Sequence, residues 1–263
     1  MTTISPLPTQ AARGNASPPS TLATALLIAR RAARESLRDR TTLLGSTFFA
    51  LLLPAGLVYF VIRPIAENAH SAQAQQTLGA LLATYLLFVG LLPSSAAVGI
   101  AAGQFAGERE QGSLTPLLAS PASNAAIFGG KVLGAVLPAI LFSIIACGGY
   151  LAEVAGMAGV DTLRLLPPAL SVAMVLLVPG YAIFSAGIAS LVSSRVRTFN
   201  TAQQISGLAI LPVMFALFGL AFKMQSWGAG ALFAAVGVIF ALDVLLIAIS
   251  GATWRREETL ARQ

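Results

Sequence analysis

Cysteine and histidine each occur once in this 263-residue sequence, as Cys147 and His70. A single cysteine excludes an intrachain disulfide and any metal cluster held by several cysteines. With one cysteine inside an apolar run and one isolated histidine, we also expect no metal site built on these ligands and no Cys/His catalytic pair within one chain. We therefore expect no catalytic residues and no metal site, and we do not expect an enzyme.

Charged residues are also scarce. They make up 10% of the chain, whereas soluble domains carry roughly 25%. Hydrophobic residues make up 56%, and the mean hydropathy is +0.81. The net charge of +6 does not indicate a nucleic-acid partner, because the basic residues cluster at the ends of apolar runs instead of forming a stripe. We expect most of the chain to be surrounded by membrane lipid.

Six apolar runs are each about long enough to cross a membrane, since a helix needs roughly 20 residues to span a ~30 Å hydrocarbon core. Five of the runs contain a proline, which membrane helices tolerate. The sequence predicts an all-α, polytopic membrane protein with six transmembrane helices within residues 42–252. The runs extend over Leu43–Ile62, Leu78–Gly103, Val132–Ala152, Ala169–Val192, Ile205–Phe222 and Ala229–Ser250, and the prolines are Pro54, Pro93, Pro138, Pro179 and Pro212.

The basic residues predict the orientation of these spans, because lysine and arginine are retained on the cytoplasmic side. With a cytoplasmic N-terminus, only Arg63, Arg164 and Lys223 face outward. We therefore expect both termini in the cytoplasm and a multi-pass protein of the cell inner (cytoplasmic) membrane. The thirteen inward residues are then Arg13, Arg30, Arg31, Arg34, Arg38, Arg40, Arg109, Lys131, Arg195, Arg197, Arg255, Arg256 and Arg262.

The segment before the first span has two parts. Residues 1–20 are rich in Pro, Ser, Thr and Ala, and we expect a disordered cytoplasmic tail. Residues 21–41 predict an amphipathic interfacial helix whose arginines bind anionic headgroups. Each arginine would contribute about 1 kcal/mol to the binding of the helix to the membrane surface. The alternative is a solvated extension of the first span. At the other end, residues 253–263 are expected to form a second cytoplasmic tail. Apolar residues at helical spacing in 21–41 are Leu22, Leu26, Ala29, Ala33 and Leu37.

The connection between the second and third apolar runs is patterned. It reads GQFAGEREQGSLTPLLASPASNAAIFGGK from Gly103 to Lys131. Three charged residues occupy one turn ahead of three leucines, which predicts a short amphipathic helix within residues 104–121 at the cytoplasmic face.

The run GEREQGSLTPLLASPAS, followed by Gly130 and Lys131, resembles the segment between the second and third spans of ABC type-2 transporter permeases. Weaker similarity extends to the Arg-rich segment before the first span, the turn 193–198 and the tail from Trp254. The resemblance implies a coupling helix that binds an ATPase subunit; the alternative is a charged loop that is merely solvated. The implied partner-binding residues are Glu108, Arg109, Glu110, Gly112, Ser113, Leu114, Leu117 and Leu118.

A nucleotide-binding loop is missing from the chain. The pair Gly130 and Lys131 is followed by Val132, and Ala125 stands where the first glycine of a phosphate loop belongs. No cofactor is therefore expected in this chain, and ATP and Mg are expected on a partner subunit. The resemblance implies an ABC ATPase subunit and a second permease, in a homodimer or a heterodimer, which together export a hydrophobic or amphiphilic substrate.

Asp243 is the only ionisable residue well inside a predicted span. We interpret it as a polar contact between helices or subunits, with a place in the substrate path as the alternative. The chain lacks the row of intramembrane carboxylates and the inverted repeat that support the alternative function, a secondary transporter or channel without an ATPase partner. A second alternative is a membrane subunit like the haem exporter of cytochrome c maturation.

Overall fold

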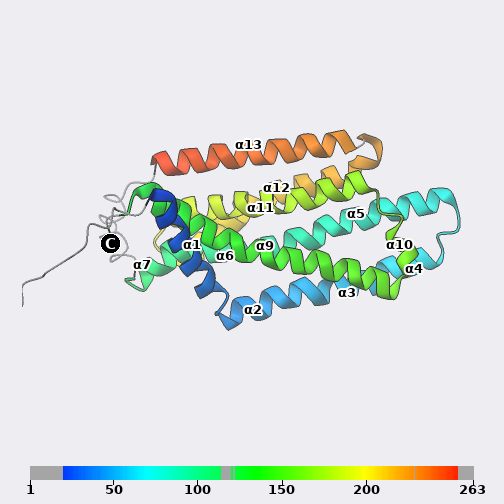
Figure 1. Ribbon diagram of the computed structural model, residues 1–263, viewed down its shortest axis with the longest axis horizontal. Coiled ribbons are helices and arrows are strands. Elements are labelled where there is room, and N and C mark those ends of the chain that lie inside the picture. The colour runs from blue at the N-terminus through cyan, green and yellow to red at the C-terminus, as the bar shows by residue number, and fades with distance from the viewer. Residues whose placement is uncertain (1–19, 114–119, 121, 228, 254–263) are drawn as a thin grey trace, which may run out of the picture.

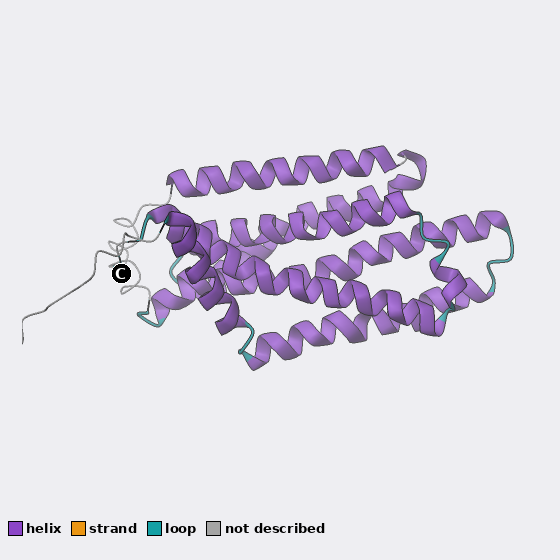
Figure 2. Ribbon diagram, viewed as in Figure 1, coloured by secondary structure: helices purple, strands orange, loops and turns teal. Residues whose placement is uncertain are grey.

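The computed structural model describes residues 20–113, 120, 122–227 and 229–253, and every regular element in this part of the chain is helical (Figures 1 and 2). The predictions of an all-α fold and of six spans are confirmed. The predicted tails, except Ser20 and Thr253, lie outside the described residues, as do Leu114, Leu117 and Leu118. The six helices long and apolar enough to cross a membrane are Leu43–Glu67, Ala72–Glu110, Asn124–Met157, Pro168–Ser193, Phe199–Ala221 and Gly230–Ser250.

The helices form an elongated bundle with two distinct ends (Figure 1). Helices α1 (Thr21–Ser36) and α7 (Glu108–Glu110) lie at one end, called here the α7 end, where α13 (Ala229–Thr253) also finishes. The short helices α4 (Arg63–Glu67) and α10 (Val160–Leu163) lie at the opposite end, called the α10 end. An even number of spans places both ends of the described chain on the same side.

The first span contains two π-helical turns. It consists of α2 (Arg40–Thr47), η1 (Phe48–Leu52), α3 (Leu53–Leu57), η2 (Val58–Ile62) and α4. Pro54 follows the end of η1 by two residues, and Pro64 follows the end of η2 by two residues. A proline removes one N–H and its ring clashes with the carbonyl four residues back, so the wider π turn relieves both problems.

The second span is one helical stretch, Ala72–Glu110, made of α5 (Ala72–Ser94), α6 (Ala96–Ala102), η3 (Gly103–Gly107) and α7. It begins at an N-cap in which the Ser71 hydroxyl accepts a hydrogen bond from the Ala74 N–H at 3.1 Å. The helix extends beyond the predicted run Leu78–Gly103 at both ends, because polar residues continue it after the apolar ones stop.

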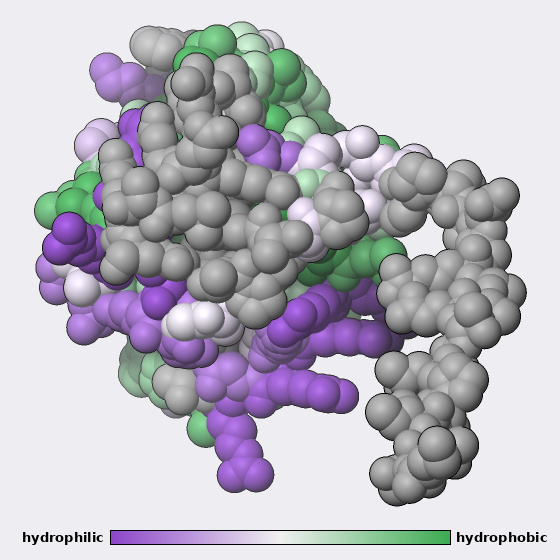
Figure 3. Space-filling view, turned by 90° about the vertical axis from the view of Figure 1, so that its left-hand side faces the viewer, coloured by the Kyte–Doolittle hydropathy of each residue, from purple (hydrophilic) through white to green (hydrophobic). Residues whose placement is uncertain are grey.

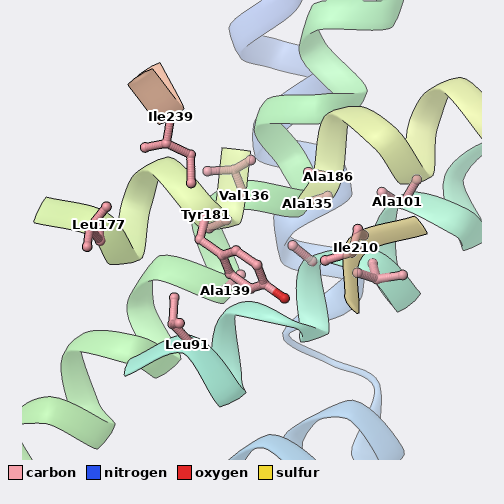
Figure 4. Close-up of a cluster of buried hydrophobic side chains, with 14 of the residues drawn as sticks. Leu91, Ala101, Ala135, Val136, Ala139, Leu177, Tyr181, Ala186, Ile210 and Ile239 are labelled. Carbon is pink, nitrogen blue, oxygen red and sulfur yellow. The ribbon is translucent and has the colours of Figure 1, made fainter. Parts of the chain in front are cut away.

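The remaining spans are α9 (Asn124–Met157), α11 (Pro168–Ser193), α12 (Phe199–Trp227) and α13. Pro138, Pro179 and Pro212 lie inside α9, α11 and α12, as the sequence predicts. The main core forms where α5, α6, α9 and α11 meet. Figure 4 shows Tyr181 of α11 beside Leu91 of α5 and Ala139 of α9. Many core residues are alanines, and small side chains allow membrane helices to approach closely.

Helix α1 packs against the beginning of α9 through two glycines. A Cβ added at Gly130 would lie 2.7 Å from the Ala25 carbonyl oxygen, and one added at Gly134 would lie 2.5 Å from the Ala32 Cβ. Ala29 and Ala33 of α1 are buried, whereas Leu22 and Leu26 are exposed. The placement of α1 at the membrane surface stays a prediction, and the exposed leucines are the side chains that lipid would cover.

Candidate functional site

The charged turn of the predicted coupling segment is the last turn of the second span. Glu108, Arg109 and Glu110 form α7, which continues the helix directly from η3. The helix ends in a Schellman motif: the Gly112 N–H donates to the Arg109 carbonyl at 3.0 Å and the Ser113 N–H to the Glu108 carbonyl at 2.9 Å. Gly112 has φ +69°, a conformation that glycine adopts without steric cost.

Glu108 is paired with Lys131, the last residue of the Gly-Lys motif. The Lys131 Nζ donates to Glu108 Oε2 at 2.6 Å and also to the Gln104 carbonyl, and it lies 4.9 Å from the centroid of the Phe105 ring. The Lys131 side chain is only 2% exposed, whereas the Glu108 side chain is 29% exposed. Removing one partner of a buried ion pair costs about 3–5 kcal/mol, because the other charge is left uncompensated.

Arg109 is held by the end of the fourth span. Its guanidinium donates to the Val196 carbonyl at 2.6 Å and to the Ser194 carbonyl at 3.2 Å, just beyond the last residue of α11. Carbonyl groups at a helix C-terminus carry partial negative charge, so a cation is stabilised there. This contact joins residues that are 87 positions apart in the sequence.

The π turn η3 is not followed two residues later by a proline, as η1 and η2 are, and it is formed instead around the Ser193 side chain. The Ser193 hydroxyl donates to the Ala102 carbonyl at 2.7 Å and accepts from the Ala106 N–H at 2.8 Å. In an α-helix these two backbone groups would bond to each other. The hydroxyl of α11 is therefore inserted into the hydrogen-bond ladder of the second span, and this insertion widens the turn.

The end of the second span is thus tied to the third span through Lys131 and to the fourth through Ser193 and the Arg109 contacts. Glu110 is exposed and takes part in none of these bonds. The sequence alone does not indicate a site role for Lys131, Ser193 or Gln104. The Gly-Lys motif and the turn beginning at Ser193 were visible as signals, but nothing in the sequence indicates which distant backbone groups they reach.

The family described as "ABC-2 family transporter protein" matches residues 26–250. The chain belongs to this family. No curated protein matches the chain. The family and the six apolar helices together make it a multi-pass membrane transport subunit, an ABC-2 permease.

The family match begins at residue 26, inside α1, so most of that helix belongs to the part of the chain that the family shares. At the α7 end, α1 also presents exposed arginines, and hydrophilic side chains gather over this end in Figure 3. One of them, Arg31, donates to Glu35 Oε1 at 2.8 Å. This hydrogen bond to Glu35 raises the pKa of Arg31 above its usual value.

Asp243 of the permease lies in the contact between α11 and α13. Cβ atoms added at Gly180 and Gly187 of α11 would lie 2.7 Å from Ile239 and 2.6 Å from Leu246 of α13. Asp243 is four residues after Ile239 and three before Leu246, so it shares their helix face. It is 3% exposed, and neither carboxylate oxygen has a hydrogen-bond partner among the described residues. Asp243 therefore lies in a seam between two helices, and its role as a polar contact stays a prediction.

Proposed function

We propose that this ABC-2 permease is the membrane-spanning subunit of an ATP-binding cassette exporter, and that a separate ATPase subunit binds at the α7 end. The observation that carries the proposal is the family match over residues 26–250. The cargo we propose is hydrophobic or amphiphilic, since the spans hold few charged groups. Two ATPase subunits and a second permease, identical or similar, would complete the transporter.

The charge distribution supports a cytoplasmic α7 end. Among the described basic residues, only Arg63, Arg164 and Lys223 lie toward the α10 end. Basic residues are retained on the cytoplasmic side during membrane insertion. The α7 end would therefore lie at the cytoplasmic face of the inner membrane, where the ATPase could bind it. The basic residues at or near the α7 end are Arg30, Arg31, Arg34, Arg38, Arg40, Arg109, Lys131, Arg195 and Arg197.

The anchoring of α7 supports a role in coupling. A force applied to Glu110 would act on a helix end that is bonded to spans three and four, so the three spans would move together. A flexible loop in this position would absorb such a displacement. Energetic coupling between distant sites is carried by rigid elements that can adopt two discrete arrangements.

The test is co-purification in mild detergent of a tagged permease with a co-expressed ABC ATPase subunit from the same organism. We expect a stable complex from the wild-type chain and a reduced yield from Glu110→Arg, because charge pairs at an interface set register and association rate. Glu108→Arg is unsuitable as the test, since it would place a second cation against the buried Lys131.

The matched control is Asp161→Arg, the same charge reversal at the α10 end, where the Asp161 side chain is 90% exposed. It should leave the complex unchanged. If the wild-type permease holds no ATPase, a secondary transporter or channel becomes the better assignment. If the complex forms but Glu110→Arg binds as well as the wild type, the ATPase docks elsewhere.

A further inference from the structure

The turn between the fourth and fifth spans, residues 194–198, lies beside the end of the second span. It connects α11, which ends at Ser193, to α12, which begins at Phe199. Arg109 of α7 donates two hydrogen bonds to backbone carbonyl groups of this turn. The turn and α7 are therefore joined directly, and a protein that contacts one of them lies within reach of the other.

The turn is held at both of its ends by hydrogen bonds. At its start, the Arg195 and Val196 N–H groups both donate to the Val192 carbonyl, at 2.9 Å and 3.1 Å. At its end, the Thr198 hydroxyl accepts a hydrogen bond from the Thr201 N–H at 3.3 Å and so caps the first turn of α12. A surface that is already held in one conformation loses less conformational entropy when a partner binds.

Charges of opposite sign are exposed on α7 and on the turn. Glu110 of α7 and Arg197 of the turn are both exposed, and neither belongs to an ion pair found among the described residues. Glu110 follows Gly107 by three residues, so the two share a helix face. A Cβ added at Gly107 would lie 4.0 Å from the ring of Phe199, the residue that follows the turn. Glu110 therefore lies on the side of α7 that faces the turn.

This mixture of charges favours a protein partner over the membrane surface. Anionic headgroups attract clusters of lysine and arginine, and the Glu110 carboxylate would repel them. A protein can instead place a basic group against Glu110 and an acidic group against Arg197. Complementary charges of this kind fix the register of an interface and disfavour wrong partners.

We propose that residues 194–198 form a second docking element for the ATPase subunit, and that this turn and α7 make up one interface. Arg197 faces an acidic group of the ATPase, and Glu110 faces a basic one. The inference rests on the proposed function, because it requires an ATPase bound at the α7 end. It adds that the ATPase contacts the connection between the fourth and fifth spans as well as the end of the second.

The consequence of two docking elements is that a displacement of the ATPase acts on three spans at once. α7 continues the second span, and the turn joins the fourth span to the fifth. Arg109 keeps the two elements in a fixed relation, because its guanidinium is bound to the carbonyl groups that follow the C-terminus of α11.

Photo-cross-linking tests which molecule lies against the turn. In a Cys147→Ala background, Arg197→Cys is labelled with a benzophenone maleimide, and membranes that contain the full-length permease and the co-expressed ATPase subunit are illuminated. We expect a covalent adduct between Arg197→Cys and the ATPase. Arg164→Cys, an exposed position at the α10 end, is the matched control and should give no such adduct. Adducts of Arg197→Cys with lipid alone would assign the turn to the membrane surface and overturn the proposal.

A charge reversal tests whether the turn contributes to affinity. Arg197→Glu should raise the Kd of the solubilised permease for the ATPase about tenfold, corresponding to about 1.4 kcal/mol. The matched control is Arg164→Glu, the same reversal at the α10 end, where the Arg164 side chain is 79% exposed. It should leave the Kd unchanged. A Kd for Arg197→Glu equal to that of the wild type would overturn the proposal.

Failure of this inference is distinguishable from failure of the proposed function. If the wild-type permease binds no ATPase, the proposed function and the second docking element are both wrong. If the ATPase binds the wild type, and Glu110→Arg raises the Kd whereas Arg197→Glu does not, only the second docking element is wrong.

Discussion

Lys131 is the residue whose environment most constrains the site. Its ammonium group is almost fully buried, and its ligands are the Glu108 carboxylate, the Gln104 carbonyl and the Phe105 ring. All three belong to the second span, so a residue of the third span fixes the rotation of the helix that ends in α7. The two charged side chains differ in their exposure to water, because water can reach Glu108 but not Lys131.

This difference in exposure predicts that removing Glu108 and removing Lys131 have unequal effects on stability in a double-mutant cycle. Glu108→Met leaves a buried ammonium group without its counterion and should destabilise the permease by about 3 kcal/mol or more. Lys131→Met leaves a carboxylate that water can solvate and should cost less, and the double variant should recover much of the loss. Unfolding in mixed micelles, followed by circular dichroism, measures the three values. Additive effects would show that the pair is not coupled.

Asp243 yields a different prediction, since it has no partner in the described part of the chain. Asp243→Leu should leave stability unchanged or raise it, because an unpaired polar group in an apolar seam costs more than a well-packed leucine. Thermal unfolding of the purified chain measures this effect. Reconstituted transport should be retained. Loss of transport at unchanged stability would move Asp243 into the substrate path.

At the scale of elements, the π turn η3 depends on one hydroxyl from another helix. Ser193→Ala removes the bridge between the Ala102 carbonyl and the Ala106 N–H, and should lower stability by about 1–3 kcal/mol. Amide hydrogen exchange in residues 102–110 should become faster. Ser194→Ala is the matched control, because among the described residues the Ser194 hydroxyl bonds only to the Leu191 carbonyl three residues before it. Equal exchange in both variants would show that the bridge is dispensable.

The docking of α1 depends on the glycines of α9. Gly134→Leu should displace α1, because even a Cβ there would overlap Ala32. The arginines of α1 would then be cut faster by trypsin, which limited proteolysis in detergent detects. Gly129→Leu is the control, because a Cβ at Gly129 meets nothing within 4 Å. If Gly134→Leu is cut no faster than this control, α1 is held by other contacts.

At the scale of the whole molecule, the orientation is open to direct labelling. In a Cys147→Ala background, we expect Asp161→Cys to react with a membrane-impermeant maleimide added outside intact spheroplasts. Ser113→Cys should react only after permeabilisation, because it follows α7. Both positions are exposed. The reverse pattern would place the α7 end outside and would remove the proposed site of ATPase binding.

The sequence by itself determined the all-α class and the number of spans. Both follow from length and composition, because only an apolar run of sufficient length can cross the bilayer as a helix. It also singled out the charged turn, but as a separate short helix within residues 104–121, whereas Glu108–Glu110 continue the second span. The boundaries were less accurate: hydropathy detects the lipid-facing part of a helix, whereas Ala72–Glu110 continues into polar residues on both sides.

Only the tertiary structure decided what the charged turn is attached to. Glu108 and Arg109 are adjacent in the sequence, yet one is bound to the third span and the other to the end of the fourth. The π turn beside them depends on Ser193, a residue at the end of the fourth span. These features depend on which helix faces lie together. Helix packing sets those faces, and the periodicity of a single apolar helix does not encode them.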